Sequence, residues 1–501
     1  MNSRPAILHG ARACHAACVL GAMATGLGAH ADLQANPHAA PTFAQATADV
    51  APINVGIIGR RIAAATAGDT LVIPEGVYHE HIRIDKPLTL EAQGRVVLDG
   101  DASGDIVEIT APDVTLRGFV IRNTGIDLDK ENCAVRVTAA RATIQDNVLD
   151  DILFGIDLRE APDSRVLNNR IGGKKLDIAR RGDGLRLWRS DRAVVEGNTI
   201  HDGRDAILWY SSGVTVRDNT AYDCRYGLHL MFSDNITITG NTLTRNSVGV
   251  YLMYSTGIEI SRNRLIQNRG PSGYGIGLKE ADQFSIRDNL IVANRSGAYI
   301  DGSPFTNARP GIFSGNTFAY NDMGVTFLPS AKGNELAENN FIDNIDQICV
   351  AGRGSLEANR FWKGDRGNFW SDYTGYDQNA DGVGDFVHES STLFESVLEH
   401  QPSLRLFLFS PAQQAIEFVG RAVPAVRPEP KFTDEVPLMR PVPVPQLASV
   451  DANTTPQLLT SGSILLGIGL ILVGLGRGEN LVRTRVRARS VTAHVPQGVS
   501  S

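Results

Sequence analysis

Two methionines and one histidine near the middle of the chain carry side chains that could bind a soft metal ion. His229 precedes Met231 by two residues, and Met253 follows in the next copy of a repeated pattern. Thioether sulfur and imidazole nitrogen are ligands that suit Cu(I). The chain has only six methionines, and two of them lie within the first 31 residues. These three side chains are therefore a candidate Cu(I) site, provided that the fold brings them together.

The repeated pattern predicts the architecture that would position them. Each copy has an apolar residue, two variable residues, an Asn and usually another apolar residue two positions later. The Asn residues are Asn147, Asn169, Asn198, Asn219, Asn241, Asn263, Asn289, Asn316, Asn339 and Asn359. Successive copies are mostly about 20–27 residues apart, which is the length of one solenoid coil. β-Branched residues that alternate with polar ones are typical of strands.

The sequence therefore predicts an all-β fold, a right-handed parallel β-helix that spans residues 52–363. The Asn residues are expected to occupy the same corner of each coil, to adopt left-handed backbone geometry and to hydrogen-bond to the coils on either side. A short amphipathic helix at residues 53–65 is expected to cap the open N-terminal end, because an uncovered edge strand would expose unpaired backbone groups.

Aligning the coils on their Asn residues places the candidate metal ligands outside the solenoid. Two columns are apolar, and they contain Leu187, Leu208, Leu230, Leu252 and Leu278, and Leu185, Ala206, Leu228, Val250 and Ile276. Because successive residues of a strand point to opposite faces, the positions between these columns point outwards. Those positions hold Arg186, Trp188, Ile207, Trp209, His229, Met231, Tyr251 and Met253.

Stacked strands lie about 4.8 Å apart, so Met231 and Met253 are expected to be direct neighbours. His229 lies on the same face, and Trp209 is expected beside Met231, where its indole could add a cation–π contact. The alternative is that this apolar strip packs under a loop or against a partner protein, as Met and Trp often do.

Two further clusters have residue types that could do chemistry. His79 and His81 share one face of a predicted strand and could share a metal, but two ligands are too few by themselves. His201, Arg204 and Asp205 are acid–base residue types in a predicted turn. A structural role is favoured for both clusters, the second as a polar corner.

The segment Asp377-x-Asn379-x-Asp381-Gly-x-Gly-Asp385 is similar to a calcium-binding loop. Oxygen ligands at alternate positions followed by glycine are typical of Ca²⁺ sites. The bidentate Glu expected at the twelfth position is replaced by His388. Calcium binding by Asp377, Asn379, Asp381 and Asp385 and a hydrogen-bonded turn are both open interpretations.

An insertion between Asn169 and Asn198 adds a basic loop. It contains Lys174, Lys175, Arg180 and Arg181. Insertions in solenoids project from one face and often bind other molecules. This loop either flanks the Met/His face or is a plain solvated loop.

Bulk composition limits the classes of function. The chain has 501 residues, 42% apolar residues, 50 glycines and a net charge of −7. An acidic balance implies no global attraction to nucleic acid, so no nucleic-acid partner is expected. Cys133, Cys224 and Cys349 fall at different positions of different coils, so no structural disulfide is expected.

The two ends of the chain suggest export and anchoring. Arg4 and Arg12 precede an apolar run that ends at a small-x-small site at Ala29 to Ala31, which is typical of a secretory signal. The expected organisation is a signal peptide at 1–31, a disordered segment at 32–51, the solenoid, a C-terminal segment with a helix at 364–421, a Pro-rich linker at 422–456, a transmembrane helix at 457–476 and a basic tail at 477–501. The positive-inside rule then places the tail in the cytoplasm and the solenoid in the periplasm.

The blocks at 367–373 and 375–385 resemble the NosD family, the periplasmic accessory proteins for copper-site maturation of nitrous oxide reductase. The resemblance implies a non-enzymatic copper protein that works with a copper chaperone, the reductase and an ABC transporter made of an ATPase and a permease. This sequence departs from the family in the ending of its Asp-rich loop, Gly384 to His388, and in its predicted C-terminal anchor.

A polysaccharide lyase, hydrolase or epimerase on the same fold is the competing hypothesis, because a fold alone does not decide function. The exterior columns offer such an enzyme Arg186, His229 and Lys279, interleaved with Trp and Met. A docking scaffold that binds no metal is the third hypothesis.

Overall fold

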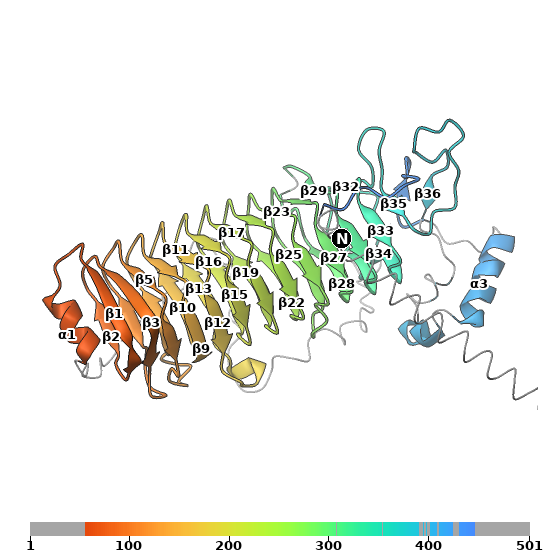
Figure 1. Cartoon of the computed structure of the whole chain (residues 1–501). Coiled ribbons are helices and arrows are strands. Elements are labelled where there is room, and N and C mark those ends of the chain that lie inside the picture. The colour runs from red at the N-terminus through yellow and green to blue at the C-terminus, as the bar shows by residue number, and fades with distance from the viewer. Residues whose placement is uncertain are drawn as a thin grey trace, which may run out of the picture. The chain divides into compact units, whose positions relative to one another are not determined.

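The computed structural model describes residues 56–306, 308–352, 354–389, 394, 397, 401–407, 410–423 and 430–445. Parallel strands stack in chain order to form a β-solenoid (Figure 1). The predicted signal peptide at 1–31, the segment 32–51, the anchor at 457–476 and the tail at 477–501 lie outside the described residues. Within the described ranges, no helix is both long and apolar enough to cross a membrane.

One sheet of the solenoid takes a single strand from each of twelve coils. Its strands are β2 (Ile82–Ile84), β4 (Val107–Ile109), β7 (Cys133–Val137), β10 (Phe154–Arg159), β13 (Leu185–Trp188), β16 (Asp205–Trp209), β19 (Tyr226–Met231), β22 (Val248–Met253), β25 (Tyr274–Lys279), β28 (Ser296–Asp301), β31 (Met323–Phe327) and β34 (Asp346–Val350). This twelve-stranded sheet carries the candidate ligands.

The other strands form a 23-stranded sheet that runs along two further faces and begins with β1 (Thr70–Tyr78) and β3 (Thr89–Asp99). One face contains β5 (Thr115–Arg117), β8 (Thr143–Gln145), β11 (Arg165–Leu167), β14 (Val194–Glu196), β17 (Thr215–Arg217), β20 (Thr237–Thr239), β23 (Glu259–Ser261), β26 (Ser285–Arg287), β29 (Gly311–Ser314) and β32 (Asn334–Ala337). The other contains β6 (Val120–Arg122), β9 (Val148–Ile152), β12 (Arg170–Gly173), β15 (Thr199–His201), β18 (Thr220–Tyr222), β21 (Thr242–Thr244), β24 (Arg264–Ile266), β27 (Leu290–Val292), β30 (Thr317–Ala319), β33 (Asn340–Ile342) and β35 (Phe369–Trp370).

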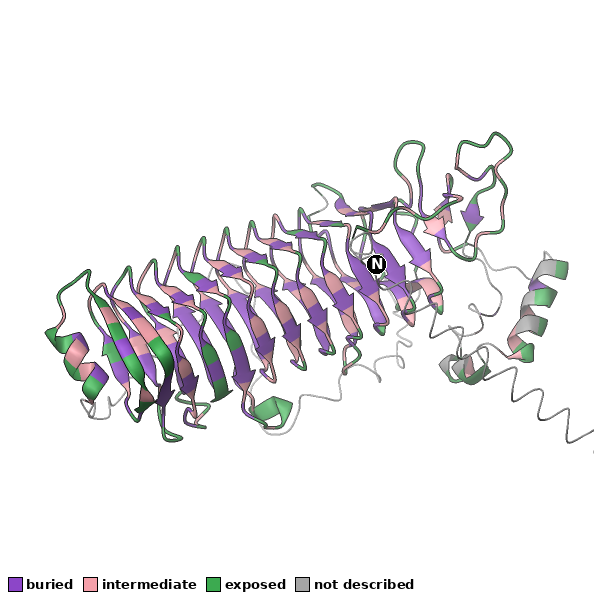
Figure 2. Ribbon diagram, in the orientation of Figure 1, coloured by how far each residue is buried: buried purple, intermediate pink, exposed green. Residues whose placement is uncertain are grey.

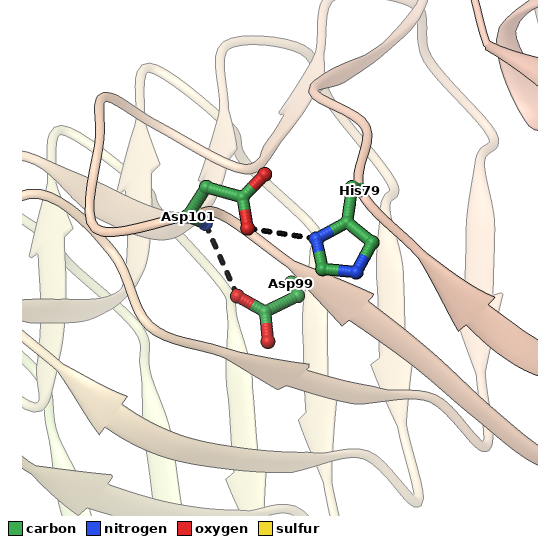
Figure 3. Close-up of side chains that lie close together, drawn as sticks. All are labelled: His79, Asp99 and Asp101. Carbon is green, nitrogen blue, oxygen red and sulfur yellow. Dashed lines mark hydrogen bonds and ion pairs between the residues drawn. The ribbon is translucent and has the colours of Figure 1, made fainter.

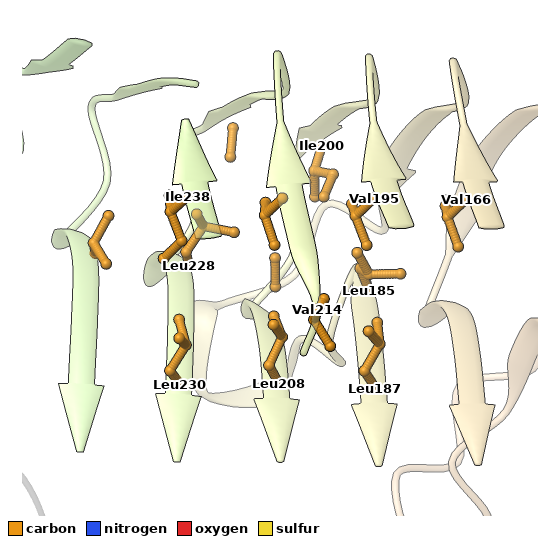
Figure 4. Close-up of a cluster of buried hydrophobic side chains, with 14 of the residues drawn as sticks. Val166, Leu185, Leu187, Val195, Ile200, Leu208, Val214, Leu228, Leu230 and Ile238 are labelled. Carbon is orange, nitrogen blue, oxygen red and sulfur yellow. The ribbon is translucent and has the colours of Figure 1, made fainter. Parts of the chain in front are cut away.

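The predicted inward columns form the core. Leu187, Leu208 and Leu230 stack in register on β13, β16 and β19, and all three are fully buried (Figure 4). Buried residues alternate with more exposed ones along most strands, as one-sided burial requires (Figure 2).

The Asn repeat forms a buried hydrogen-bonded ladder, as predicted. In each coil the Asn backbone N–H and the side-chain Nδ2 both donate to the Oδ1 of the Asn in the next coil. Asn241, for example, donates from N (2.8 Å) and Nδ2 (2.9 Å) to Asn263 Oδ1. The ladder satisfies polar groups at a tight corner that water cannot reach.

Two details of the ladder differ from the sequence prediction. The left-handed residue is the one before each Asn, such as Asp218 before Asn219, because the Asn itself must turn inwards to reach the next coil. Asn359 does not continue this ladder but accepts from Asn334 N on another corner. The ladder passes instead from Asn339 to Asn368.

Two further ladders stack at other corners without having been predicted. One contains Asn246, Asn268, Asn294, Asn321 and Asn344. The other is made of hydroxyl groups and contains Ser190, Ser211, Ser233 and Ser255. A close backbone approach also recurs, since a Cβ on Gly249 would lie 2.6 Å from the carbonyl oxygen of Gly275 in the next coil.

The N-terminal end is covered by α1 (Ile57–Ala64), within the predicted range. Ile58 and Ile62 pack on the core. The buried carboxylate of Glu80 accepts the backbone N–H groups of Ile58 and Gly59, each at 3.1 Å. A negative group at a helix N-terminus satisfies otherwise unpaired donors and the helix dipole.

The C-terminal segment contains η2 (Pro402–Phe407) and α3 (Pro411–Ala422), and the side chain of Ser410 caps the N-terminus of α3. Residues 430–445 correct the prediction of a linker at 422–456, because β37 (Thr433–Asp434) pairs with β36 (His388–Glu389). Asp434 is fully buried and accepts from Asn368 N (2.7 Å) and Trp370 Nε1 (2.9 Å).

This segment therefore covers the last coil. Without it, the last Asn of the ladder and the neighbouring indole would have buried N–H groups with no acceptor. The solenoid also extends past the predicted boundary at residue 363, because β35 pairs with β33.

Candidate functional site

The structure places Met231 and Met253 side by side on the outside of the twelve-stranded sheet. β19 and β22 are parallel neighbours, and Met231 is aligned with Met253. Both side chains are partly exposed. His229 Nε2 lies 3.4 Å from Met253 Sδ. The alignment on Asn residues thus predicted the correct strand register for all three side chains.

The His229 ring is only 7% exposed, although it projects outwards from its strand. Tyr226 meets it edge-on at 5.0 Å between ring centroids, and Tyr251 stacks beside it at 6.1 Å. Burial raises the pKa of both tyrosines above the ordinary value, so both side chains are uncharged where they pack against the imidazole. One imidazole edge faces the thioether, while the rest of the ring is enclosed.

The opposite edge of His229 faces a buried carboxylate from the previous strand. His229 Nδ1 lies 3.2 Å from Asp205 Oδ2. Asp205 also accepts from Arg225 Nε at 2.9 Å and from Arg225 Nη2. Burial alone would raise the pKa of Asp205, but the hydrogen bonds from Arg225 and His229 lower it below its ordinary value. Asp205 was expected to form a polar corner with His201, and its contact with His229 was not foreseen.

Met231 has a polar contact of its own. Trp209 Nε1 donates to Met231 Sδ at 3.1 Å, and the two residues are aligned on β16 and β19. The preceding residue of that column, Trp188, is covered by the guanidinium of Arg189 at 4.9 Å. The N–H of Trp209 therefore holds the thioether of Met231 in one orientation.

Arg186, predicted to be exterior, is the centre of a buried ion-pair network. It donates to both oxygens of Asp157 (2.9 and 2.7 Å) and to both oxygens of Glu131 (2.7 and 2.9 Å). Burial alone would raise the pKa of Asp157, but Arg186, Arg159 and Arg136 lower it to about 2. These charges neutralise one another, so Arg186 is held in place by its own chain.

The side chains of His79 and His81 do not converge on one point. His79 Nδ1 lies 2.7 Å from Asp101 Oδ1, whereas His81 contacts Asp105 O and Ser103. Within the described part of the chain, the metal-sized group of His, Cys and acidic side chains is His79, Asp99 and Asp101 (Figure 3).

Asp99 in that group is already occupied. It accepts from Arg122 Nε at 2.8 Å and from Asn123 Nδ2 at 2.9 Å. His79 and Asp101 are 58% and 60% exposed at their side chains. The group is therefore an exposed His–Asp contact beside a structural carboxylate.

The polar corner at 201–205 and the basic loop pack together. His201 stacks on Tyr222 at 5.1 Å, and its Nδ1 contacts Asp202. Lys174 Nζ lies 2.8 Å from Asp151 Oδ2, and Arg181 Nη1 donates to Asp223 O at 2.9 Å. The short helix η1 (Ile178–Arg180) lies in this loop. Lys174 and Arg181 are thus engaged by the coils, while Lys175 is 89% exposed.

The Asp-rich loop is organised as a series of turns. Asp377 accepts from the backbone N–H groups of Asp381 (3.2 Å) and Gly382 (2.8 Å). Asp381 accepts from Val383 N and from Asn379 Nδ2. Asp385 accepts from Gln378 N at 2.7 Å. The same oxygens are the ones that a calcium ion would need, so calcium binding here stays a prediction.

Among the described residues, Cys133, Cys224 and Cys349 form no disulfide. Cys133 and Cys224 are buried on different coils, and burial raises the pKa of each thiol. Cys224 N donates to Asn246 Oδ1, so this residue begins the second Asn ladder.

The fold and these side chains define a parallel β-solenoid that presents two thioethers and one imidazole on a single sheet. Imidazole and thioether are metal ligands that fit a soft monovalent ion. The nearby carboxylate of Asp205 already contacts Arg225 and His229.

The family model described as "Periplasmic copper-binding protein (NosD)" matches residues 167–375, a span that includes β16, β19 and β22. A Pseudomonas aeruginosa protein named probable ABC transporter binding protein NosD is 33% identical over 378 residues, which cover 73% of this chain and 87% of that protein. A Stutzerimonas stutzeri protein of the same name is 29% identical over 382 residues, which cover 74% and 86%. The chain belongs to the NosD family.

Among solved structures, the A-module of the Azotobacter vinelandii mannuronan C-5 epimerase AlgE6 is similar to this solenoid. The TM-score is 0.51 at 14% identity, and the match covers 63% of this chain and 93% of that module. This likeness shows the shared β-helix fold and nothing about activity.

Proposed function

We propose that this chain is a periplasmic accessory protein that holds Cu(I) at Met231, Met253 and His229 and delivers it to the copper sites of nitrous oxide reductase. In this proposal it works with the ATPase and permease of an ABC transporter and receives copper from a chaperone. The family description as a periplasmic copper-binding protein and the relatives' name as ABC transporter binding proteins support the proposal.

The observation that carries the proposal is that two adjacent strands bring an imidazole nitrogen next to one thioether and align a second thioether beside it. Met231 is aligned with Met253, and His229 Nε2 lies 3.4 Å from Met253 Sδ. Atoms this close can contact the same ion, given metal–ligand bonds of about 2.0–2.3 Å. Because both methionines are partly exposed, a protein partner could reach the bound ion and exchange it.

The test replaces both methionines by leucine in the full-length chain. Leucine preserves size and apolarity, so the free energy of unfolding should change by less than about 1.5 kcal/mol. Loss of both thioethers should steeply weaken Cu(I) binding, measured by competition with a chromophoric chelator, because thioether is a ligand that selects Cu(I). Reductase assembled in cells with this variant should lack copper.

Met323→Leu is the matched control, because Met323 is also partly exposed on the twelve-stranded sheet but lies on β31. It should leave Cu(I) binding unchanged. Unaltered Cu(I) binding and a fully metallated reductase in the double variant would refute the metal site and favour a docking scaffold.

Localisation is the second part of the proposal. The solenoid is placed in the periplasm by an N-terminal signal, and residues 457–476 anchor it to the inner membrane with the tail in the cytoplasm. A reporter enzyme that is active only in the cytoplasm should be active when it is fused after Ser501, and a reporter that is active only in the periplasm should be inactive there. Complete extraction of the protein from membranes by carbonate would contradict the anchor.

The competing carbohydrate enzyme receives less support from the geometry. Arg186, which would neutralise an acidic sugar, is held by Asp157 and Glu131. The relatives that define the family are named as binding proteins.

A further inference from the structure

Each ring nitrogen of His229 contacts one side chain. The contact at Nδ1 requires a hydrogen on that nitrogen, whereas the contact at Nε2 is with an atom that has no hydrogen to donate. Asp205 has no proton to donate when ionised, so the Nδ1 atom facing it must carry the N–H. In the neutral ring, Nε2 then has a bare lone pair. That lone pair points toward Met253 Sδ at 3.4 Å, and a thioether has no proton to donate either.

In that tautomer, two electron-pair donors face each other with no hydrogen between them. A small cation between the two atoms would satisfy both. The orientation also has a cause in the fold, because Asp205 is fully buried on β16 and Arg225 donates to both of its carboxylate oxygens. The carboxylate cannot rotate away without leaving the guanidinium unpaired.

We propose that Asp205 is the positioning residue of the copper site: it keeps the proton of His229 on Nδ1 and thereby aims the Nε2 lone pair at the point shared with Met253. This inference rests on the proposed function, which supplies the metal, but the tautomer itself belongs to the metal-free protein. Carboxylates that orient metal-binding histidines typically change metal affinity by about 10–100-fold when they are replaced.

Asp205→Asn is the informative substitution. Asp205 Oδ1 accepts from Arg225 Nε, while Oδ2 accepts from Arg225 Nη2 and faces His229 Nδ1. The introduced amide removes the negative charge and replaces one of these two acceptors with an NH₂ donor. With the NH₂ at the Oδ2 position, it donates to Nδ1 and moves the ring proton to Nε2, as when an orienting Asp is replaced by Asn in a Ser-His-Asp triad. In either orientation the anionic acceptor of the Nδ1 proton is lost, so the Nε2–H tautomer becomes more populated. The proton on Nε2 would then occupy the position that the metal needs.

The tautomer is measured first, without copper. Full-length protein labelled with ¹⁵N only in histidine gives long-range ¹H–¹⁵N spectra, and His229→Gln identifies the signals of His229. The parent should show the proton on Nδ1, and Asp205→Asn should show an increased population with the proton on Nε2. A purely structural carboxylate that only neutralises Arg225 would not move this proton.

Cu(I) binding is measured second, by the same chelator competition on the same proteins. Asp205→Asn should bind Cu(I) at least about tenfold more weakly than the parent. Asp99→Asn is the matched control, because Asp99 is also a buried carboxylate that pairs with an arginine, Arg122 at 2.8 Å, but lies on β3, away from His229. It should change neither the tautomer nor the affinity.

The outcomes separate this inference from the proposed function. An unchanged tautomer in Asp205→Asn, or a changed tautomer with full Cu(I) affinity, overturns the positioning role. A parent protein that binds no Cu(I) but shows the Nδ1 proton moving in Asp205→Asn refutes the proposed copper site and leaves Asp205 as the residue that sets the tautomer.

Discussion

The Asn ladder should contribute more to stability than its polar composition suggests, and Asn241→Leu tests this. Asn241 is fully buried in the middle of the stack. Its Nδ2 donates to Val216 O (3.0 Å), Thr239 O (3.1 Å) and Asn263 Oδ1 (2.9 Å). Its Oδ1 accepts from Asn219 N (2.9 Å) and Asn219 Nδ2 (3.0 Å). Leucine has a similar shape but can make none of these five bonds.

The cost can be worked out bond by bond. The backbone N–H of Asn219 loses its side-chain partner in a place that water does not reach, which costs about 1–3 kcal/mol. The other lost bonds contribute about 0.5–1.5 kcal/mol each, and the added apolar surface offsets part of this. The expected loss is about 4 kcal/mol in the free energy of unfolding.

Urea unfolding followed by circular dichroism measures this loss. Arg217→Ala is the control from the neighbouring corner, because it removes only a partly exposed ion pair with Glu196 and should cost less than about 1 kcal/mol. If Asn241→Leu costs no more than Arg217→Ala, the ladder is a consequence of coil geometry and not a source of stability.

The remaining predictions concern the C-terminal closure and the Asp-rich loop. Burial raises the pKa of Asp434 to about 6, compared with about 3.9 in an unfolded chain, so the folded state binds more protons between these values. Stability from this group is therefore fully present below about pH 4 and falls by about 3 kcal/mol as the pH rises through the folded pKa. Asp434→Asn should lose this pH dependence when unfolding is measured from about pH 4 to about pH 7, and an unchanged slope would contradict the assignment. In the Asp-rich loop, Asp381→Ala should lower the melting temperature more in calcium than in excess chelator if the loop binds Ca²⁺. Equal shifts in both conditions would leave only the turn, since Asp381 also accepts from Val383 N.

The sequence by itself determined the architecture and the register of the candidate site. A solenoid repeats the same local geometry, so one Asn per coil is enough to align the strands, and strand alternation then assigns faces. That is why Met231 was correctly aligned with Met253, and Leu208 was correctly placed in the core between Leu187 and Leu230.

Features that depend on contacts between coils were decided only by the tertiary structure. Asp205 was visible as an acidic residue in a turn, but its contact with His229, 24 residues later, depends on the side-chain direction at the start of β16. The burial of Arg186 similarly depends on Glu131, which is 55 residues earlier in the chain. No local pattern encodes such pairs.

The C-terminal closure shows the same limit. Residues 430–445 have the prolines of an extended linker, and an extended backbone is what lets Thr433–Asp434 pair with β36. Composition alone describes how such a segment is shaped and not what it packs against. Whether it closes the solenoid was decided by the unpaired donors of Asn368 and Trp370, which need the buried carboxylate of Asp434.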